Sequence, residues 1–574
     1  MLSASILKDI LKKKHLLNDK ELNLALREAN KKNQPLETYL LENNLITEEK
    51  LYQSAASFLK VPFINLSGRD VKKEAMSSIS TPLAMARQVV AFAEEPTEIK
   101  VAVLDANDLE LIEFIKKKTG KEVKVYLTTP SSLKEALNRY RVGLESELAA
   151  LPPKETAFDE KTLKKLAEDL PIINIVNNIF EQAVFDGASD IHIEPQEKNL
   201  VVRYRVDGVL RSPLLLPKNT QSGIIARIKI LANLKLDEHM LPQDGRIKLT
   251  VQDTKYSLRV SLLPVYDGEK IVMRLLKEDA KPLSLADLGF LPPDLEVLER
   301  NLQKPYGIIL ATGPTGCGKT TTLYAVLNRL NKPGVNISTI EDPIEYRIPG
   351  VNQSQINPRV GYTFAAGLRA FLRQDPDIIM VGEIRDNETA LISIHAALTG
   401  HLVLSTLHTN DAPTALPRLL DMEVPSFMLA YTANMIIAQR LVRKICSFCQ
   451  KEYQLTKKDI AGLGEKITDL SRLLKCFKKY GQVKEGVNKL EKISFYRGEG
   501  CHHCHKEGYH GRLGIYEVLE VDKEMAELLN RQASLDEIRK LAREKGMNTM
   551  FEDGLIKAQM GLTSLEEVLE ATRD

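Results

Sequence analysis

The sequence lacks an excess of either charge and lacks any long apolar run. Lys plus Arg number 79 and Asp plus Glu number 77, which gives a formal net charge of +2 over 574 residues. A balance this close gives no global electrostatic reason to expect nucleic acid or an anionic membrane as a partner, although a local basic patch stays open. No stretch approaches the about 18 consecutive apolar residues that a membrane-spanning helix needs.

Cysteine is also scarce. The chain has six cysteines, and four of them form two C-x-x-C pairs. So few cysteines in so long a chain cannot build a disulfide framework, and the paired spacing suits thiolates in a reducing compartment. The first fifteen residues, MLSASILKDILKKKH, lack the continuous apolar segment of a secretory signal. We therefore expect a soluble cytosolic protein that meets a membrane only through partners.

What the chain does contain is the composition of a globular protein. Hydrophobic residues make up 43% and charged residues 27%, which excludes disorder as the dominant state. At about 150 residues per domain, the length predicts three or four domains. Changes of pattern along the chain predict a helical repeat module (1–66), a small α/β domain (67–146), a linker (147–160), an α/β middle domain (161–282) and a larger C-terminal domain (283–574).

The N-terminal module shows a weak internal repeat. Shifting the sequence by 29 residues pairs leucine with leucine or isoleucine at several positions, as in Leu7 with Leu36. Each copy is typical of a short amphipathic helix, a break and a second helix. Asn18 and Glu21 fit the cap-plus-acid pattern at the start of such a helix. We therefore predict two repeated helical hairpins.

Strands and helices alternate after the repeat. The patterns predict three strands and one helix, at 89–93, 99–104, 123–127 and 109–118, which is typical of a small α/β domain. In the middle domain, a helix is predicted at 172–185. The alternation at 200–206 and 256–261 predicts a sheet with a polar face rich in arginine.

The strongest motif lies in the last domain. Residues 306–312 form a short apolar run suited to a buried strand, and residues 313–320 then read G-x-x-x-x-G-K-T before a predicted helix. Glycines let the backbone wrap a polyphosphate, and the loop amides and helix N-terminus supply partial positive charge. We expect Lys319 to reach the β and γ phosphates and the Thr320 hydroxyl to bind Mg²⁺. Cys317 is interpreted as a small filler rather than a nucleophile.

Acidic turns follow two later strands. Residues 378–381 predict a buried strand that Glu383 follows, and residues 338–346 predict a strand that runs into an acidic turn. Carboxylates at the C-terminal ends of parallel strands face the glycine loop, where one can associate with Mg²⁺ and another can orient or deprotonate water. His401 and His408 flank a further apolar strand, and we expect both to sense the γ-phosphate.

These motifs resemble those of the type II/type IV secretion ATPase superfamily. The glycine loop, TIEDPIE, DPDIIMVGE and TGHLVLSTLH look like its Walker A, Asp-box, atypical Walker B and His-box motifs, at 313–320, 339–345, 375–383 and 399–408. ASDIHIEP, RYRVDGVL and LPQDGR are similarly typical of its middle domain, at 188–195, 203–210 and 241–246. The layout resembles type IV pilus assembly ATPases and type II secretion ATPases from about residue 161 onward, and the first 150 residues match more loosely.

The resemblance implies an α/β fold. It implies a RecA-like P-loop NTPase domain at the C-terminus, a PAS-like α/β middle domain, a zinc-binding insertion, and N-terminal helical and small α/β adaptor domains. It also implies that Glu345 activates water and that Glu383 associates with the metal together with Thr320. The implied catalytic set is Lys319, Glu345, Glu383, Arg259 and Arg274.

The resemblance further implies a set of nucleotide contacts. Two of them, Arg369 and Arg373, match arginines that a neighbouring subunit supplies in the family. Guanidinium groups suit this task because negative charge develops on the transferred phosphoryl group. The implied nucleotide-binding residues are Gly313, Pro314, Thr315, Gly316, Cys317, Gly318, Lys319, Thr320, Thr321, His401, His408, Arg369 and Arg373. From their pattern alone, Arg203 and Arg205 stay open between surface ion pairs and ligand contacts.

The paired cysteines predict a metal site between residues 446 and 504. Two thiolates at the C-x-x-C spacing can hold one tetrahedral Zn²⁺, and 51 residues between the pairs predict a lysine-rich helical insert. Four thiolates complete the shell, which makes the zinc structural rather than catalytic and leaves the neighbouring histidines as rivals. The predicted ligands are Cys446, Cys449, Cys501 and Cys504. Cys476 is expected to be a plain buried thiol.

The residues and the resemblance together predict a motor. A ring, a homohexamer by family analogy, would bind Mg-ATP and use hydrolysis to drive type IV pilus assembly through an inner-membrane platform protein. The alternative within the family is a type II secretion or DNA-uptake pseudopilus ATPase. A DNA translocase or helicase is the alternative from another class. The near-zero net charge and the absence of an aromatic and basic single-strand platform disfavour it, so we expect no direct nucleic-acid partner.

Some members of this family bind cyclic di-GMP through a tandem Arg-Leu-Gly motif in the helical module. Here the matching positions read Ile-Leu-Lys at 6–8 and Pro-Leu-Glu at 35–37. Because the arginine that would pair with a phosphate is absent from both copies, we predict that the module does not bind this dinucleotide.

Overall fold

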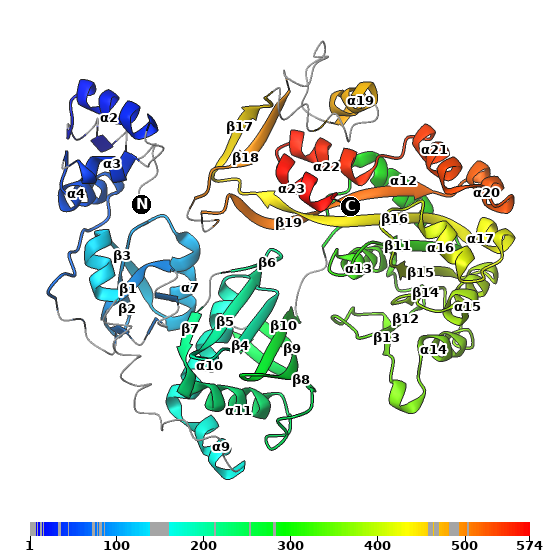
Figure 1. Cartoon of the computed structure of the whole chain (residues 1–574), viewed down its shortest axis with the longest axis horizontal. Coiled ribbons are helices and arrows are strands. Elements are labelled where there is room, and N and C mark those ends of the chain that lie inside the picture. Colours follow the sequence, from blue (N-terminus) through cyan, green and yellow to red (C-terminus); the bar gives the residue numbers. More distant parts are fainter. Residues whose placement is uncertain are drawn as a thin grey trace. The chain divides into compact units, whose positions relative to one another are not determined.

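The computed structural model divides the chain into two units, Met1–Asp279 and Ala280–Asp574 (Figure 1). The positions that it leaves undescribed are 1–6, 8–9, 12–13, 15, 32–35, 44, 70, 72–74, 77, 80–82, 85–86, 138–159, 212–213, 252–253, 279–282, 457–462, 464–469, 481–492, 502–503, 505 and 574. The predicted linker 147–160 lies outside the described residues except for its last position. Three of the six positions compared with the Arg-Leu-Gly motif, Ile6, Lys8 and Pro35, lie outside them as well.

The N-terminal helices share one hydrophobic core with the α/β segment that follows. They are α2 (Asp19–Lys31), α3 (Leu36–Glu42) and α4 (Glu48–Leu59). The paired residues Leu7 and Leu36 are both buried in this core, as the repeat predicts. The predicted cap is present, because Asn18 Oδ1 accepts from the Glu21 N–H at 2.8 Å and the Glu21 carboxylate accepts from the Asn18 N–H at 3.0 Å.

The three predicted strands and the predicted helix come next. They are β1 (Val89–Glu94), β2 (Glu98–Val103), α7 (Leu109–Thr119) and β3 (Glu122–Leu127). β1 pairs antiparallel with β2, and β2 pairs parallel with β3. Asp108 caps α7 by accepting from the Leu111 N–H at 3.1 Å, and it also pairs with the buried Arg87 at 3.0 Å. One carboxylate thus both starts the helix and neutralises a buried cation.

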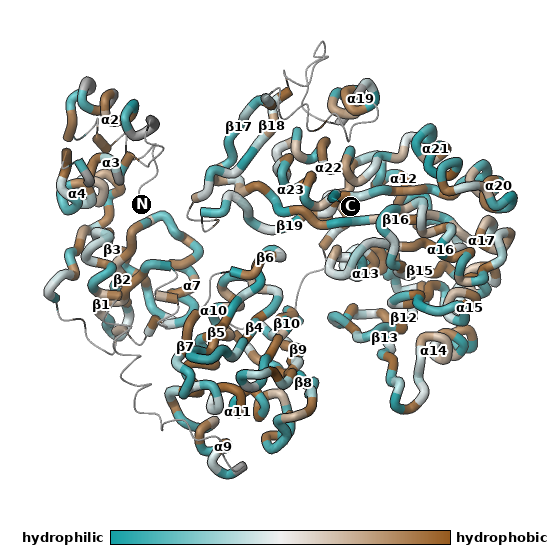
Figure 2. Tube along the Cα trace, in the orientation of Figure 1, coloured by the Kyte–Doolittle hydropathy of each residue, from teal (hydrophilic) through white to brown (hydrophobic). Residues whose placement is uncertain are grey.

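The middle domain is a seven-stranded antiparallel sheet of order β6-β5-β4-β10-β9-β8, with β7 beside β5. Its elements are α9 (Glu160–Glu168), α10 (Leu170–Phe185), β4 (Asp190–Pro195), β5 (Asn199–Val206), β6 (Val209–Leu210), β7 (Leu214–Pro217), η1 (Lys218–Thr220), α11 (Gln221–Leu231), β8 (Gln243–Val251), β9 (Thr254–Val265) and β10 (Gly268–Lys277). Hydrophobic residues run along α10 and α11 (Figure 2) and form one core with the inner face of the sheet. The other face is polar and rich in arginine, as the alternation predicts.

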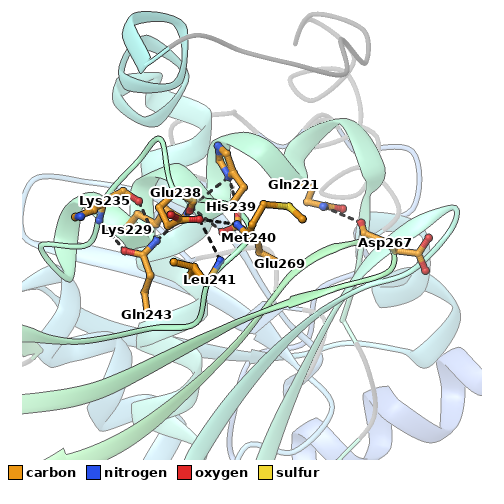
Figure 3. Close-up of polar contacts among 10 residues, drawn as sticks. All are labelled: Gln221, Lys229, Lys235, Glu238, His239, Met240, Leu241, Gln243, Asp267 and Glu269. Carbon is orange, nitrogen blue, oxygen red and sulfur yellow. Dashed lines mark hydrogen bonds and ion pairs between the residues drawn. The ribbon is translucent and has the colours of Figure 1, made fainter.

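A buried lysine holds the loop that leads into β8. Lys229, on α11, donates to the Glu238 carbonyl at 2.7 Å and pairs with the Glu269 carboxylate at 2.7 Å (Figure 3). His239 Nδ1 lies 2.9 Å from the other carboxylate oxygen of Glu269. Gln243, the first residue of β8, ties the two ends of the loop together through its side-chain amide. The entry into β8 is therefore built around one buried ion pair.

Removing the cation of this pair should destabilise the unit. Lys229→Met leaves the Glu269 carboxylate buried without its ammonium partner, so we expect a loss of about 3–5 kcal/mol in the free energy of opening. Hydrogen exchange of the backbone amides in α11 and β10 of the full chain measures this free energy, and we expect these amides to exchange faster in Lys229→Met. Lys235→Met, which changes an exposed lysine of the same loop, is the matched control and should stay within about 0.5 kcal/mol. Equal protection in the two variants would contradict the assignment.

The second unit contains a seven-stranded sheet of order β13-β12-β14-β15-β11-β16-β19. All neighbours are parallel except β19, which runs antiparallel to β16. The strands are β11 (Gly307–Thr312), β12 (Ile337–Glu341), β13 (Asn352–Gln355), β14 (Ile378–Val381), β15 (Leu402–Leu407), β16 (Ala433–Ile445) and β19 (Tyr509–Glu520). The strands predicted at 306–312 and 378–381 are confirmed as β11 and β14.

Helices cover both faces of this sheet. One core joins it to α12 (Pro292–Leu302) and α13 (Lys319–Leu330). The core on the opposite face includes residues of α14 (Phe364–Phe371), α15 (Asn387–Leu398), α16 (Ala415–Asp421), α17 (Ser426–Thr432), α20 (Lys523–Asn530) and α21 (Leu535–Glu544). The remaining elements include η2 (Pro358–Val360), α22 (Met550–Gln559) and α23 (Leu565–Ala571). Because both faces are covered, β11 and β14 are apolar almost throughout. The edge strand β13 is polar, and β15 and β16 carry buried polar residues such as Ser405 and Gln439.

The segment between β16 and β19 is an insertion. It contains a two-stranded ribbon of β17 (Gln450–Gln454) and β18 (Ser494–Gly498), with α19 (Leu470–Tyr480) between the two strands. α19 confirms the predicted helical insert in part, and the residues around it lie outside the described ones. Within the described residues of the whole chain, we find no helix with the length and hydropathy of a membrane span.

Candidate functional site

The glycine loop follows β11, whose six residues are all buried. Gly313 has φ of +142°, and a Cβ there would lie 2.5 Å from the Gln439 carbonyl oxygen and 2.8 Å from Cys317 Sγ. Gly318 has φ of +90° and stands immediately before α13. A side chain is therefore excluded at Gly313 by lack of space and disfavoured at Gly318 by the backbone conformation.

Lys319 begins α13 and folds back over the loop. Its Nζ donates to the carbonyls of Gly313 at 2.8 Å and Pro314 at 3.2 Å, and the residue is only 9% exposed. Burial lowers the pKa of Lys319, and the nearby charge of Glu383 acts in the opposite direction. Thr320 and Thr321 follow in the first turn of the helix, where N–H groups have no partner inside the helix. An ammonium and free amides thus meet at one helix end, which is the chemistry that binds phosphate.

The cysteine inside the loop behaves as the sequence predicts. Cys317 is 4% exposed, and burial raises the pKa of its thiol, so the residue stays protonated and unreactive.

Gln439, on β16, braces the loop and was not identified from the sequence. Its side-chain amide donates to the Cys317 carbonyl at 2.6 Å and accepts from the Thr322 hydroxyl at 2.8 Å. Only the pairing of β16 with β11 brings this residue to the loop, and a single glutamine in an apolar run carries no local signal of that contact.

The structure brings Glu383 and His408 together at the same end of the sheet. Glu383 follows β14 and His408 follows β15, and these two strands are parallel neighbours. His408 Nε2 lies 3.4 Å from one Glu383 oxygen, and Arg385 pairs with the other at 2.7 Å. The hydroxyl of Thr312, the last residue of β11, binds the loop just beyond His408. The predicted acid therefore lies where the glycine loop begins.

His401 does not join this group. It precedes β15, and its carbonyl accepts from the N–H of Gly307 at the start of β11. Its Nδ1 lies 2.9 Å from the Ala396 carbonyl oxygen. The strand between the two histidines crosses the whole sheet, which separates them by about 20 Å. The expectation that both histidines stand beside one γ-phosphate is therefore wrong for His401 within a chain, because seven positions of extended backbone reach from one edge of the sheet to the other.

The acidic turn after β12 packs against α13. The backbone N–H of Glu345 donates to the hydroxyl of Tyr324 on α13 at 3.3 Å. Glu341, the last residue of β12, is 2% exposed and also bonds to this tyrosine. The turn is thus attached to the helix that begins with Lys319.

Arg369 and Arg373 lie at the end of α14 and just beyond it. Arg369 pairs with Glu388 in the first turn of α15, and about half of its side chain is exposed. Arg373 donates to the Arg369 carbonyl at 3.0 Å. Both guanidinium groups are thus at the surface of the unit, where a second chain can reach them.

Cations line up across the polar face of the middle-domain sheet. Arg246, Arg259 and Arg274 stand directly opposite one another on β8, β9 and β10. Asp190 on β4 follows Arg274 in the same row and pairs with it at 3.2 Å. Like charges directly opposite in a sheet destabilise it, so the row favours anionic partners. Asp190 is such a partner for Arg274, and Glu278 pairs with Arg246 at 3.4 Å. Arg246 is the last residue of the LPQDGR motif, but its place in this row follows only from the strand register.

The two arginines that the pattern left open both form ion pairs. Arg203 pairs with Glu194 at 2.6 Å, and Arg205 lies 3.7 Å from Asp190 and donates to the Gly208 carbonyl at 2.8 Å. The structure therefore favours the ion-pair interpretation for both.

The four predicted cysteine ligands converge. Their sulfur atoms all lie within 4.8 Å of one another, with three separations of 3.7 Å among Cys446, Cys449, Cys501 and Cys504. A tetrahedral shell with metal–sulfur bonds of about 2.3 Å places its sulfurs about 3.8 Å apart, so this donor set fits a metal ion. Cys476 lies apart from the cluster, and its half-buried thiol donates to Asn548 Oδ1.

A buried glutamate supports the segment after His408. Glu517, on β19, accepts from the N–H of Ala412 at 3.0 Å and from the N–H of Met550 at 3.1 Å. It is 6% exposed, and burial raises the pKa of its carboxyl to about 7. The position of this segment therefore depends on a carboxyl group that titrates near neutral pH.

Comparison with known proteins identifies the family. The sequence profile of the type II/IV secretion system protein family matches residues 165–570. The chain belongs to this family. A second profile, of the MshEN domain, matches residues 59–147, which include all three strands of the small sheet.

Secretion and pilus proteins are similar to this family member over most of its length. The type IV pilus assembly ATPase PilB of Pseudomonas aeruginosa is 38% identical over 570 residues, covering 98% of this chain and 97% of that protein. PilB of Myxococcus xanthus is 38% identical over 576 residues, covering 98% of each. Type II secretion system protein E of Pseudomonas aeruginosa is 44% identical over 433 residues, covering 75% of this chain and 81% of that protein.

A solved structure supports the fold. The X-ray structure of the Yersinia pseudotuberculosis ATPase DotB is 21% identical, with a TM-score of 0.50, and covers 73% of this chain and 95% of that one. Together with the family profile, it confirms the predicted fold class.

Glu517 makes stability depend on pH in a defined direction. Burial raises the pKa of the Glu517 carboxyl from 4.5, its ordinary value, to about 7 in the folded chain. Between these pH values the folded chain binds more protons than the unfolded chain, so the free energy of unfolding falls as the pH rises. The contribution is on the order of 3 kcal/mol. We expect Glu517→Gln to flatten the decline of the thermal midpoint between about pH 5 and 7.5, whereas the exposed Glu566→Gln leaves the slope unchanged. Identical slopes for the two variants would refute the assignment.

Proposed function

We propose that this chain is an ATPase motor that hydrolyses Mg-ATP to drive type IV pilus assembly through an inner-membrane platform protein. The observation that carries the proposal is the juxtaposition of Lys319, folded over its glycine loop, with Glu383 and His408 at the same end of the sheet. Similarity to type IV pilus assembly ATPases over 98% of the chain supports the task assigned to that site.

In the proposed site, each group has one role. Lys319 and the amides of the glycine loop bind the β and γ phosphates of ATP. Thr320 and Glu383 would hold the magnesium ion, whose charge stabilises the phosphates; a hydroxyl and a carboxylate are oxygen donors that suit it. Glu345 takes a proton from the attacking water, and His408 contacts the γ-phosphate. His401 has no part in this arrangement within its own chain.

We assign the arginines to charge stabilisation. Arg259 and Arg274 belong to the arginine row, which is Arg246, Arg259 and Arg274 on β8, β9 and β10. They stabilise the negative charge of the phosphates bound in their own chain or in a neighbouring one. Arg369 and Arg373 act from a neighbouring subunit, consistent with their exposed positions. Arginines in such roles raise rates by about 10³–10⁵ in other nucleotidases. A requirement for neighbouring arginines fits a ring, and we propose a homohexamer that works in the cytoplasm and reaches the membrane through its partners.

Pseudopilus assembly in type II secretion is the second candidate. The observation that favours it is the higher identity, 44%, to a type II secretion protein over three quarters of the chain. Expression in strains that lack either ATPase separates the two, because restored surface pili support the first and restored protein export supports the second.

Substitutions at the proposed site should separate hydrolysis from folding. We expect Lys319→Ala to reduce ATP turnover by at least about 10³-fold, since the phosphates lose their ammonium, with the thermal midpoint and metal content retained. Glu345→Gln should lower kcat by about 10²-fold or more with little change in nucleotide affinity. Lys332→Ala, at an exposed position beyond α13, is the control and should keep full turnover. Undiminished hydrolysis by the purified Lys319→Ala protein counts decisively against the proposal.

We also propose that the cysteine cluster holds one structural Zn²⁺ per chain. Elemental analysis of the purified protein should find about one zinc, and Cys446→Ser/Cys449→Ser should lose it and lower the thermal midpoint. Cys476→Ser removes a thiol outside the cluster and should keep the metal. A metal content that the double substitution does not change would rule out this site.

A further inference from the structure

A buried tyrosine joins the helix of the phosphate loop to the acidic turn. Tyr324 lies on α13, five positions after Lys319, and is 0% exposed. Its hydroxyl donates to the carboxylate of Glu341 at the end of β12. Because Lys319 begins the same helix, this tyrosine is rigidly connected to the residue that we assign to the phosphates.

Uncharged donors hold the Glu341 carboxylate. Besides Tyr324, it accepts from the Thr339 hydroxyl at 2.6 Å and from the Gln353 amide at 3.2 Å. Burial raises the pKa of Glu341, and the charge of Glu345 raises it further. A buried carboxylate held by hydroxyl and amide groups loses stabilisation whenever one of these donors moves. The network therefore tolerates little displacement of Tyr324 from β12.

The same hydroxyl reaches the residue that we assign to water activation. Tyr324 Oη accepts from the backbone N–H of Glu345 and from Gln353 Nε2, each at 3.3 Å. A phenol has one donor and two acceptor positions, and these contacts use all of them. The Tyr324 ring also meets the Tyr346 ring edge-on, with centroids 4.6 Å apart. The hydroxyl of Tyr324 thus links the backbone of Glu345 to α13.

We propose that Tyr324 is a positioning residue that sets the Glu345 carboxylate relative to the phosphates held by the glycine loop. The inference rests on the proposed function of Glu345. Because Tyr324 lies on α13 and its hydroxyl holds the Glu345 N–H, the distance from Glu345 to the phosphates depends on this contact. A displacement of about 1 Å at a catalytic group can lower a rate by about 10²-fold, so loss of the hydroxyl acts on kcat rather than on binding.

Tyrosine-to-phenylalanine substitutions in the full chain test this role. Tyr324→Phe keeps the buried ring and removes only the hydroxyl. We expect kcat to fall about 10- to 100-fold, with KM and the affinity for a fluorescent ATP analogue within about twofold. Tyr346→Phe is the matched control, since it keeps the ring pair and the Tyr324 hydroxyl, and its kcat should stay within about twofold. An unchanged kcat for Tyr324→Phe overturns the inference.

A double-mutant cycle distinguishes positioning from general damage. If Tyr324 acts through Glu345, Tyr324→Phe lowers turnover no further in a Glu345→Gln background. An equal fold-loss in both backgrounds means damage independent of Glu345 and overturns the inference while leaving the proposed function in place. Full activity of Glu345→Gln alone would instead overturn the proposed role of Glu345, and the positioning role of Tyr324 with it. The activity of the Glu345→Gln single variant therefore tells the two outcomes apart.

Discussion

Parallel pairing of β11, β14 and β15 is the constraint on which the candidate site depends. Because these strands end at one edge of the sheet, a glycine loop, a carboxylate and an imidazole that are far apart in sequence arrive at the same place. Covering helices bury both faces of the sheet, so β11 and β14 carry their polar groups only at or just beyond their ends. At these ends, burial lowers the pKa of Lys319, and the charge of Glu383 is close enough to raise it. Charges interact more strongly in such a partly buried place than in water, so an anion that binds there is held strongly.

Much of this arrangement was predictable because its determinants are local. The spacing of glycine, lysine and threonine predicts the phosphate loop, and the length and composition of two apolar runs predict β11 and β14. The Asn18 cap is present because capping involves only neighbouring residues. Gln439 was missed, and the place of Arg246 in the row was not predicted, for the opposite reason: both depend on strand register, which a single sequence does not display. The expectation for His401 failed for a related reason. The spacing of two histidines in the sequence does not show that an extended strand places them at opposite ends of β15.

The structure holds its charged side chains in two ways. In the middle domain, three guanidinium groups stand in one cross-strand row, where Asp190 pairs with Arg274 and Glu278 pairs with Arg246. In the second unit, Glu341 and Glu517 are held by hydroxyl, amide and backbone N–H groups, whereas the fully buried Asp553 pairs with Lys557 at 2.5 Å. The arginine row favours anionic partners, and the uncharged donors around Glu341 and Glu517 favour a fixed geometry.

β16 gives the molecule a direct mechanical connection. Gln439, which braces the glycine loop, and Cys446, which belongs to the cysteine cluster, are seven positions apart. β16 runs to Ile445, with a register shift against β19 between Arg443 and Ile445. One short strand segment therefore joins the cysteine cluster to the residue beneath the phosphate loop, and the covalent path between them is only seven residues long.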